Sequence, residues 1–146
     1  MENTNTTSNK PKKIKLDFKD SRYATGRRKT SIAKVWVKKG SGNIHVNGLK
    51  MNEYFKRPVH QIIVTRPLEI SQVSKNYDVK CSVRGGGLSG QAGAIILGIS
   101  KALISHDENL KKSLKKDKLT TRDSRVVERK KYGHRKARRS FQFSKR

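Results

Sequence analysis

The residues best suited to chemistry lie in a glycine-rich segment, RGGGLSGQAGA, from Arg84 to Ala94. Gly85, Gly87 and Gly90 have the spacing of a dinucleotide-binding fingerprint, between a predicted strand and a predicted helix. Such a site also needs an acidic residue at the end of the next parallel strand, ~20 residues further on, to bind the ribose. That distance falls at Asp107 to Leu110, between two predicted helices, and no Gly-Lys-Ser/Thr follows. We therefore expect no nucleotide cofactor.

Two other interpretations of this segment are compatible with each other. It could be a tight turn that requires positive φ, with Ser89 capping the helix that follows. The free N–H groups at that helix start could also hold a phosphate beside Arg84. We expect both, and the residues predicted to contact phosphate here are Arg84, Gly86, Gly87, Ser89 and Gly90.

A second cluster, ATGRRKTS, runs from Ala24 to Ser31. Three consecutive cations, Arg27, Arg28 and Lys29, cannot all face one core. Such a run is often only a solvated surface. Here Gly26 would let the backbone approach a partner closely, which favours phosphate contact.

The third cluster is the C-terminal segment, VERKKYGHRKARRSFQFSKR. From Lys118 to Arg146, twelve Lys and Arg stand against two acids, Asp123 and Glu128. Such a run could be a nuclear-import patch or a histone-like DNA arm. Aromatic residues among arginines instead favour folded RNA, which displays unpaired bases, although the phenylalanines could also fold back onto the body. The predicted RNA contacts are Arg122, Arg125, Arg129, Lys130, Lys131, Tyr132, Arg135, Lys136, Arg138 and Arg139.

The overall charge points to a polyanionic partner. The 146 residues include 36 Lys and Arg and 11 acidic residues, a net charge of +25. Held in a compact body, that charge repels itself, so nucleic acid, an anionic membrane or an acidic protein would stabilise it. The chain contains no evident catalytic triad and no paired carboxylates. Its four histidines lack metal-ligand spacing, so we expect neither an enzyme nor a metal site.

Composition divides the chain into three parts. Residues 1–22 are polar and without periodicity, and we expect a disordered arm. Residues 23–119 form the predicted globular body, and residues 120–146 a basic tail with almost nothing to bury. Only 32% of residues are hydrophobic. No apolar run approaches the ~20 residues of a membrane span. The N-terminal segment resembles neither a secretory signal peptide nor a good organellar transit peptide. A single cysteine, Cys81, lies in an apolar alternation and is predicted to be a small core residue.

Strands are predicted where apolar residues alternate. Ser31 to Lys38 is one such strand, and after a turn at Gly40 to Asn43 the alternation of Ile44 and Val46 should complete a hairpin with it. Leu68 and Ile70 could begin a third strand. A clearer one carries Val79, Cys81 and Val83.

Helices are predicted from three-and-four spacing and from end signals. Two short ones should cover Met51 to Lys56 and the segment from Pro58 to just before Pro67. The longest should start near Gln91, with Ala92, Ile95, Ile96, Ile99, Ala102 and Leu103 facing the core and Gly93 and Gly98 admitting a strand. A last helix, capped by Asp107, should bury Leu110 and Leu114. The result is a two-layer α+β body.

Taken together, the three clusters closely resemble small-subunit ribosomal protein nine, in its bacterial or organellar branch. The matching strings are TGRRKTSIAKVWVK, VRGGGLSGQAGAI and TRDSRVVERKKYGHRKAR, in the order found in that family, with QFSKR at the end. They span Tyr23 to Arg146.

The resemblance implies a roughly four-stranded sheet backed by helices, with a left-handed βαβ connection and a long basic tail. It implies a structural component of the small-subunit head that binds ribosomal RNA beside neighbouring head proteins, with no cofactor and no membrane. The tail tip, Ser144, Lys145 and Arg146, would reach the anticodon stem-loop of P-site transfer RNA.

Some features depart from that family's pattern. The arm before Tyr23 is longer than in most relatives, and Ser140-Phe141 replace a base and a proline or small polar residue. The sequence of the segment RDSRVVERKKYG is most similar to those of alphaproteobacterial and mitochondrially encoded members. Ribosomes of a bacterial cytoplasm and of a mitochondrial matrix both fit.

Overall fold

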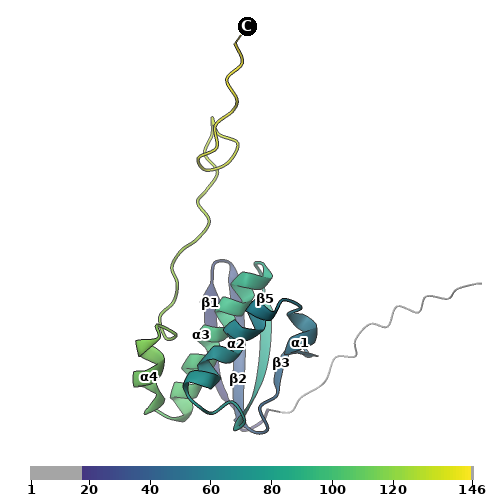
Figure 1. Ribbon diagram of the computed structural model, residues 1–146, viewed down its shortest axis with the longest axis vertical. Coiled ribbons are helices and arrows are strands. Elements are labelled where there is room, and N and C mark those ends of the chain that lie inside the picture. Colours follow the sequence, from purple (N-terminus) through teal and green to yellow (C-terminus); the bar gives the residue numbers. More distant parts are fainter. Residues whose placement is uncertain (1–17, 146) are drawn as a thin grey trace, which may run out of the picture.

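A computed structural model describes residues 18–145, which form five strands and four helices (Figure 1). In chain order they are β1 (Arg22–Arg28), β2 (Ser31–Lys39), β3 (Ile44–Val46), β4 (Leu49–Lys50), α1 (Met51–Tyr54), α2 (Pro58–Ile70), β5 (Tyr77–Arg84), α3 (Leu88–His106) and α4 (Leu110–Lys116). The α+β class is confirmed, with one more strand than the roughly four expected. The predicted arm lies mostly outside the described residues, as does Arg146.

The five strands form one sheet in the order β1-β2-β5-β3-β4. β5 lies antiparallel to β2 and parallel to β3, so it separates these two strands. The predicted hairpin between them is therefore wrong. The tight hairpin joins β3 to β4 instead, through Asn47 and Gly48. Both have positive φ, 52° and 84°, as the two-residue turn of a twisted hairpin favours.

The hydrophobic core lies between the sheet and α3. Alternation along β2 buries Ala33, Val35 and Val37 on one face. The predicted stripe of α3 is buried against them, except for Ile96, which is half-buried. Cys81 lies in this core as predicted, and burial raises the pKa of its thiol.

Small residues let α3 approach β1 closely. A Cβ on Gly26 would fall onto the carbonyl oxygen of Ala94 and 2.6 Å from the amide nitrogen of Gly98. A Cβ on Gly98 would in turn lie 3.2 Å from the Cβ of Val35. The expectation that Gly98 admits a strand is confirmed for both β1 and β2. This close approach explains why β1 carries the small residues Ala24 and Gly26 where it faces α3.

The third strand predicted at Leu68 and Ile70 is wrong, because α2 continues through Pro67 to Ile70. Proline inside a helix removes one backbone hydrogen bond. Here Pro67 and Leu68 are both buried in the core, so their packing offsets that loss.

Two predicted caps are wrong as well. α3 begins at Leu88 rather than near Gln91, with Gly87 at the N-cap and no side-chain cap, so Ser89 does not cap it. Asn109, not Asp107, precedes α4. The carboxylate of Asp107 accepts the N–H of Asn109 at 3.0 Å and so shapes the turn before the helix.

α3 is long and apolar enough, by length and composition, to cross a membrane. This corrects the expectation that no segment comes near that threshold. The helix packs on the sheet and supplies ten buried residues, which is the arrangement of a core helix.

Candidate nucleic-acid interface

The glycine loop between β5 and α3 is a tight turn held against the start of β2. Gly85 and Gly86 have φ of 75° and 61°, a region that favours glycine. Ser31 donates through Oγ to the carbonyl of Gly85 at 3.0 Å, and Gln91 donates to the same oxygen at 3.2 Å. The prediction of a turn that needs positive φ is confirmed, at these two glycines.

The other residues of the loop have different surroundings. Gly87 has φ of −105°, and a Cβ there would meet nothing within 4 Å. Ser89 is exposed, and its Oγ lies 3.1 Å from Nε2 of His60. Gly90 is buried, where a Cβ would approach Ser31 Oγ to 2.8 Å. We therefore assign Gly90 to packing rather than to contact with a ligand.

The turn between β1 and β2 lies beside this loop. A Cβ on Gly85 would come within 2.6 Å of the carbonyl oxygen of Thr30. Arg27 and Lys29 are exposed, whereas Arg28 is half-buried and its side chain crosses α3 at Gly93. The fold thus brings together two clusters that are more than fifty residues apart in the sequence.

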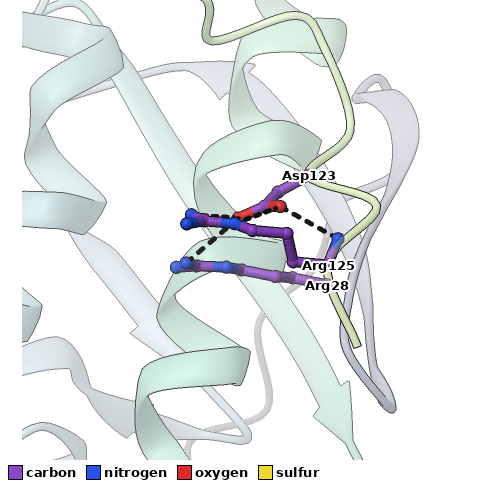
Figure 2. Close-up of polar contacts among 3 residues, drawn as sticks. All are labelled: Arg28, Asp123 and Arg125. Atoms are coloured by element: carbon purple, nitrogen blue, oxygen red, sulfur yellow. Dashed lines mark hydrogen bonds and ion pairs between the residues drawn. The ribbon is translucent and has the colours of Figure 1, made fainter. Parts of the chain in front are cut away.

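The tail is rooted on the body by a carboxylate between two guanidinium groups (Figure 2). Asp123 lies 3.2 Å from Nη2 of Arg28 and 2.9 Å from Nη2 of Arg125. It also accepts the backbone N–H of Arg125 at 3.1 Å. Hydrogen bonds from Arg125, together with the charge of Arg28, hold the pKa of Asp123 well below its usual value. We call Arg28, Asp123 and Arg125 the tail root.

Asp123 is a residue that the sequence patterns do not single out, since there it is only one of two acids in a basic segment. The only feature of the sequence that could have indicated a role is its place: Asp123 follows the end of the apolar pattern and lies between two cations, Arg122 and Arg125. The sequence could not show that Arg28, from the first strand of the body, forms the second ion pair with Asp123.

A hollow of about 270 Å³ opens beside the tail root, between β1, α2, α3 and the start of the tail. Four cations line it, Arg27, Arg28, Arg66 and Lys118, against one carboxylate, that of Asp123, and its apolar side chains include Ile63, Ile96 and Leu119. The Nε of Arg28 is buried without a hydrogen-bond partner among the described residues. An acceptor entering the hollow would find positive charge on several sides.

Beyond the root, residues 126–145 leave the body without any helix or named strand (Figure 1). Glu128 pairs with Lys131 at 2.8 Å and with Arg138 at 3.0 Å, and these hydrogen bonds lower its pKa. Within the described residues, no carboxylate lies within 4 Å of the remaining tail cations, which are Arg122, Arg129, Lys130, Arg135, Lys136, Arg139 and Lys145.

The tail aromatics do not pack on the body. Tyr132 and Phe143 are 93% and 88% exposed. The guanidinium of Arg135 lies 5.4 Å from the ring centre of Phe141, a cation–π contact within the tail itself. The alternative that the phenylalanines fold back onto the body is thus wrong for this arrangement of the chain.

The topology after α3 differs from that of a dinucleotide-binding site. Such a site requires a parallel strand after the helix, with an acidic residue at its end. Here α3 is followed by α4, and Asp107 lies in the turn between them. Within residues 18–145, no three His, Cys, Asp or Glu side chains gather as metal ligands would.

Comparison with known families agrees with these features. The family described as ribosomal protein S9/S16 matches residues 26–146, which include the β1–β2 turn, the glycine loop, the tail root and the whole tail. The match covers most of the chain. The protein therefore belongs to the ribosomal protein S9/S16 family, and is a structural component of the small ribosomal subunit.

Proposed function

We propose that the protein binds small-subunit ribosomal RNA through one basic surface formed by the β1–β2 turn, the glycine loop and the tail. The observation that carries this proposal is the row of exposed tail cations without carboxylate partners within residues 18–145. Phosphates would neutralise them and release counterions, which is the main source of affinity for nucleic acid.

The hollow beside the tail root supports this proposal. Three further cations line it together with Arg28, whose Nε is buried and unpartnered among the described residues. A phosphate oxygen in the hollow would satisfy that donor, whose burial otherwise carries a free-energy cost. Arg27, Lys29 and Arg84 are exposed nearby and would contact the RNA backbone on either side.

RNA fits the tail better than duplex DNA does. Tyr132 and Phe143 are the most exposed large hydrophobic side chains of the described residues. Aromatic rings stack on unpaired bases, which folded RNA displays and duplex DNA does not. A histone-like protein would bind both with similar affinity at the same salt concentration.

We further propose that the tail tip contacts the anticodon stem-loop of P-site transfer RNA. Ser144 and Lys145 are exposed, and Arg146 lies outside the described residues. Arg146 would offer a planar fork for bidentate phosphate contact, and Lys145 a compact charge. Head proteins would be the neighbours of the body.

Deleting Lys145 and Arg146 tests this role. Subunits should assemble normally, because assembly should rest on the body and on the basic residues from Arg122 to Arg139. They should hold P-site transfer RNA more weakly by about 1–3 kcal/mol, the worth of one charged hydrogen-bonded contact. The measurement is transfer RNA dissociation from programmed subunits.

A matched control for this deletion, Lys111→Gln with Lys115→Gln, removes two charges from the exposed side of α4. It should leave dissociation of transfer RNA unchanged. Equal rates for the native and shortened tails would refute the P-site role.

We infer a ribosome of the bacterial or organellar kind, in a bacterial cytoplasm or a mitochondrial matrix. This inference is supported by the sequence RDSRVVERKKYG, from Arg122 to Gly133, which resembles alphaproteobacterial and mitochondrially encoded versions. Sedimentation of the chain with small subunits from isolated mitochondria or from bacterial lysate distinguishes the two compartments.

A further inference from the structure

The face of the sheet opposite the two long helices is a second surface with the composition of an RNA-binding site. Along β2, the residues whose side chains alternate away from the core are Ile32, Lys34, Trp36 and Lys38. The pairing of β1 and β5 with β2 places Tyr23, Thr25, Arg27, Asp78, Lys80, Ser82 and Arg84 on the same face, with Asp78 opposite Lys38. We call these eleven residues the open face.

One end of the open face is aromatic. Tyr23 and Trp36 are cross-strand partners with ring centres 5.3 Å apart. The ammonium of Lys80 lies 5.8 Å from the ring centre of Trp36 and 5.8 Å from that of Phe18. Tyr23 is 48% exposed, so one side of this pair is open to solvent. The two ring planes are inclined by 44°, and an exposed ring beside a cation is suited to a nucleobase and its phosphate.

The other end of the open face is a shallow hollow of about 230 Å³ lined by Ile32, Lys34, Ser82 and Arg84. Two cations, one apolar side chain and one hydroxyl thus border it. Ile32 is 44% exposed there. The four-residue step along β2 from Ile32 to Trp36 spans about 13 Å, so the hollow and the aromatic pair could contact successive nucleotides of one strand.

Two cations of the open face are not matched by acids within the sheet. Cross-strand neighbours in a solvated sheet are stabilised when their charges are opposite. Here Lys34 faces Ser82, and Arg84 faces Ile32. In the described part of the chain, neither cation has a carboxylate within 4 Å.

We propose that the open face binds a single-stranded segment of RNA, with bases on Tyr23 and Trp36 and phosphates near Lys34 and Arg84. The proposal rests on the RNA-binding function proposed above and adds a site on the opposite side of the sheet from α3. Unpaired RNA is favoured over a protein segment because two cations without acidic partners among the described residues, Lys34 and Arg84, share the face with an exposed Tyr23 ring that lies beside the half-buried Trp36.

Trp36 is the only tryptophan of the chain, so its fluorescence reports on this face alone. The full chain is titrated with an unlabelled oligouridylate, and binding is measured in parallel by anisotropy of the labelled oligomer. Stacking should quench Trp36 saturably, whereas an RNA duplex of the same length should bind without quenching. Binding of the single strand without quenching would overturn the open face and leave the proposed function standing. Absence of any RNA binding would count against both.

Substitutions separate stacking from general charge. Trp36→Ala should weaken oligouridylate binding at least about fivefold, the lower bound for losing one base stack, and Trp36→Phe should restore most of it. Lys34→Gln should weaken both binding and quenching. The controls are Ile62→Ala, on the exposed side of α2, and Lys111→Gln, on α4. Equal losses in the controls and in the face variants, with unchanged thermal unfolding, would refute the site.

Discussion

Asp123 determines where the tail starts. Its carboxylate lies between Arg28 of β1 and Arg125 of the tail (Figure 2). Because all three groups are partly in water, the pairs contribute little to folding. Their effect is on direction, since they fix the first residues of a charged segment against the body and thereby limit the paths that it can take.

Asp123→Asn should release the tail root without changing the melting temperature. The neutral amide loses the attraction to both guanidinium groups. Backbone ¹⁵N relaxation of Thr121 to Val126 should report faster motion. Glu128→Gln removes the same charge further along the tail, and it should leave these amides unchanged. Equal order in both variants would mean that the root is held by something else.

The same carboxylate predicts no pH dependence near neutrality. Hydrogen bonds from Arg125 depress the pKa of Asp123 below its ordinary value of 3.8. Because this pKa is depressed, the ion pairs of Asp123 with Arg28 and Arg125 are fully formed when the pH is above the ordinary value. They are lost only as the pH falls through the lower pKa of the folded protein. The relaxation of the root should therefore stay constant between about pH 5 and pH 8. A transition within that range would contradict this assignment.

Gly26 and Gly87 differ in whether the fold leaves space for a side chain at that position. A Cβ on Gly26 would collide with the backbone of α3, whereas one on Gly87 would meet nothing within 4 Å. Gly26→Ala should therefore reduce the free energy of unfolding by about 2 kcal/mol or more. Gly87→Ala should leave it within about 0.5 kcal/mol, as is usual for exposed positions. Chemical denaturation measures both, and similar values would contradict the close approach of α3 to β1.

At the scale of elements, the glycine loop should tolerate an added side chain but not an added negative charge. Gly87 is exposed with φ of −105°, so Gly87→Asp is not strained. Its carboxylate would face RNA phosphate, at a cost of roughly fivefold in affinity if the charges lie about 4 Å apart in water. Gly87→Asn, of the same shape, should bind normally. The difference should vanish near 1 M salt, where screening shortens to about 3 Å. Equal affinities at low salt would remove the loop from the interface.

Elements that show a periodic pattern of apolar residues within their own sequence could be predicted, whereas features that depend on contacts between distant segments could not. β2, β5 and the core stripe of α3 followed from periodicity, because burial of one face imposes it. The order of the strands did not, since alternation does not say which strand is the neighbour, and β5 enters between β2 and β3 from thirty residues away. β1 was missed because its inward residues, Ala24, Gly26 and Arg28, are small or charged, as the close approach of α3 requires.

The candidate site divides in the same way. The three basic clusters were visible as composition, and the turn at Gly85 and Gly86 as glycine spacing. Their meeting around Ser31 and Arg28 was not visible, because it depends on the packing of α3 against β1. The open face was missed because its cations and aromatics belong to three strands whose order was unknown.

At the scale of the whole molecule, a folded body carries a tail that contributes little to its core. Leu114 and Leu119 are the last buried apolar residues among those described. Removing Arg122 to Arg146 should therefore leave a body that unfolds cooperatively at nearly the native temperature. Calorimetry measures this, and loss of the transition would place part of the tail in the core.

The salt dependence of RNA binding by this shortened chain tests the central claim most directly. The native chain and the chain ending at Thr121 are titrated with a small-subunit head RNA fragment over a range of salt. If the tail neutralises phosphates, the plot of log Kobs against log salt should become shallower by about 0.7–0.9 for each phosphate that the shortened chain no longer reaches. Affinity at low salt should fall with it. Parallel lines of equal slope would show that the tail cations do not contact phosphate, and would contradict the account.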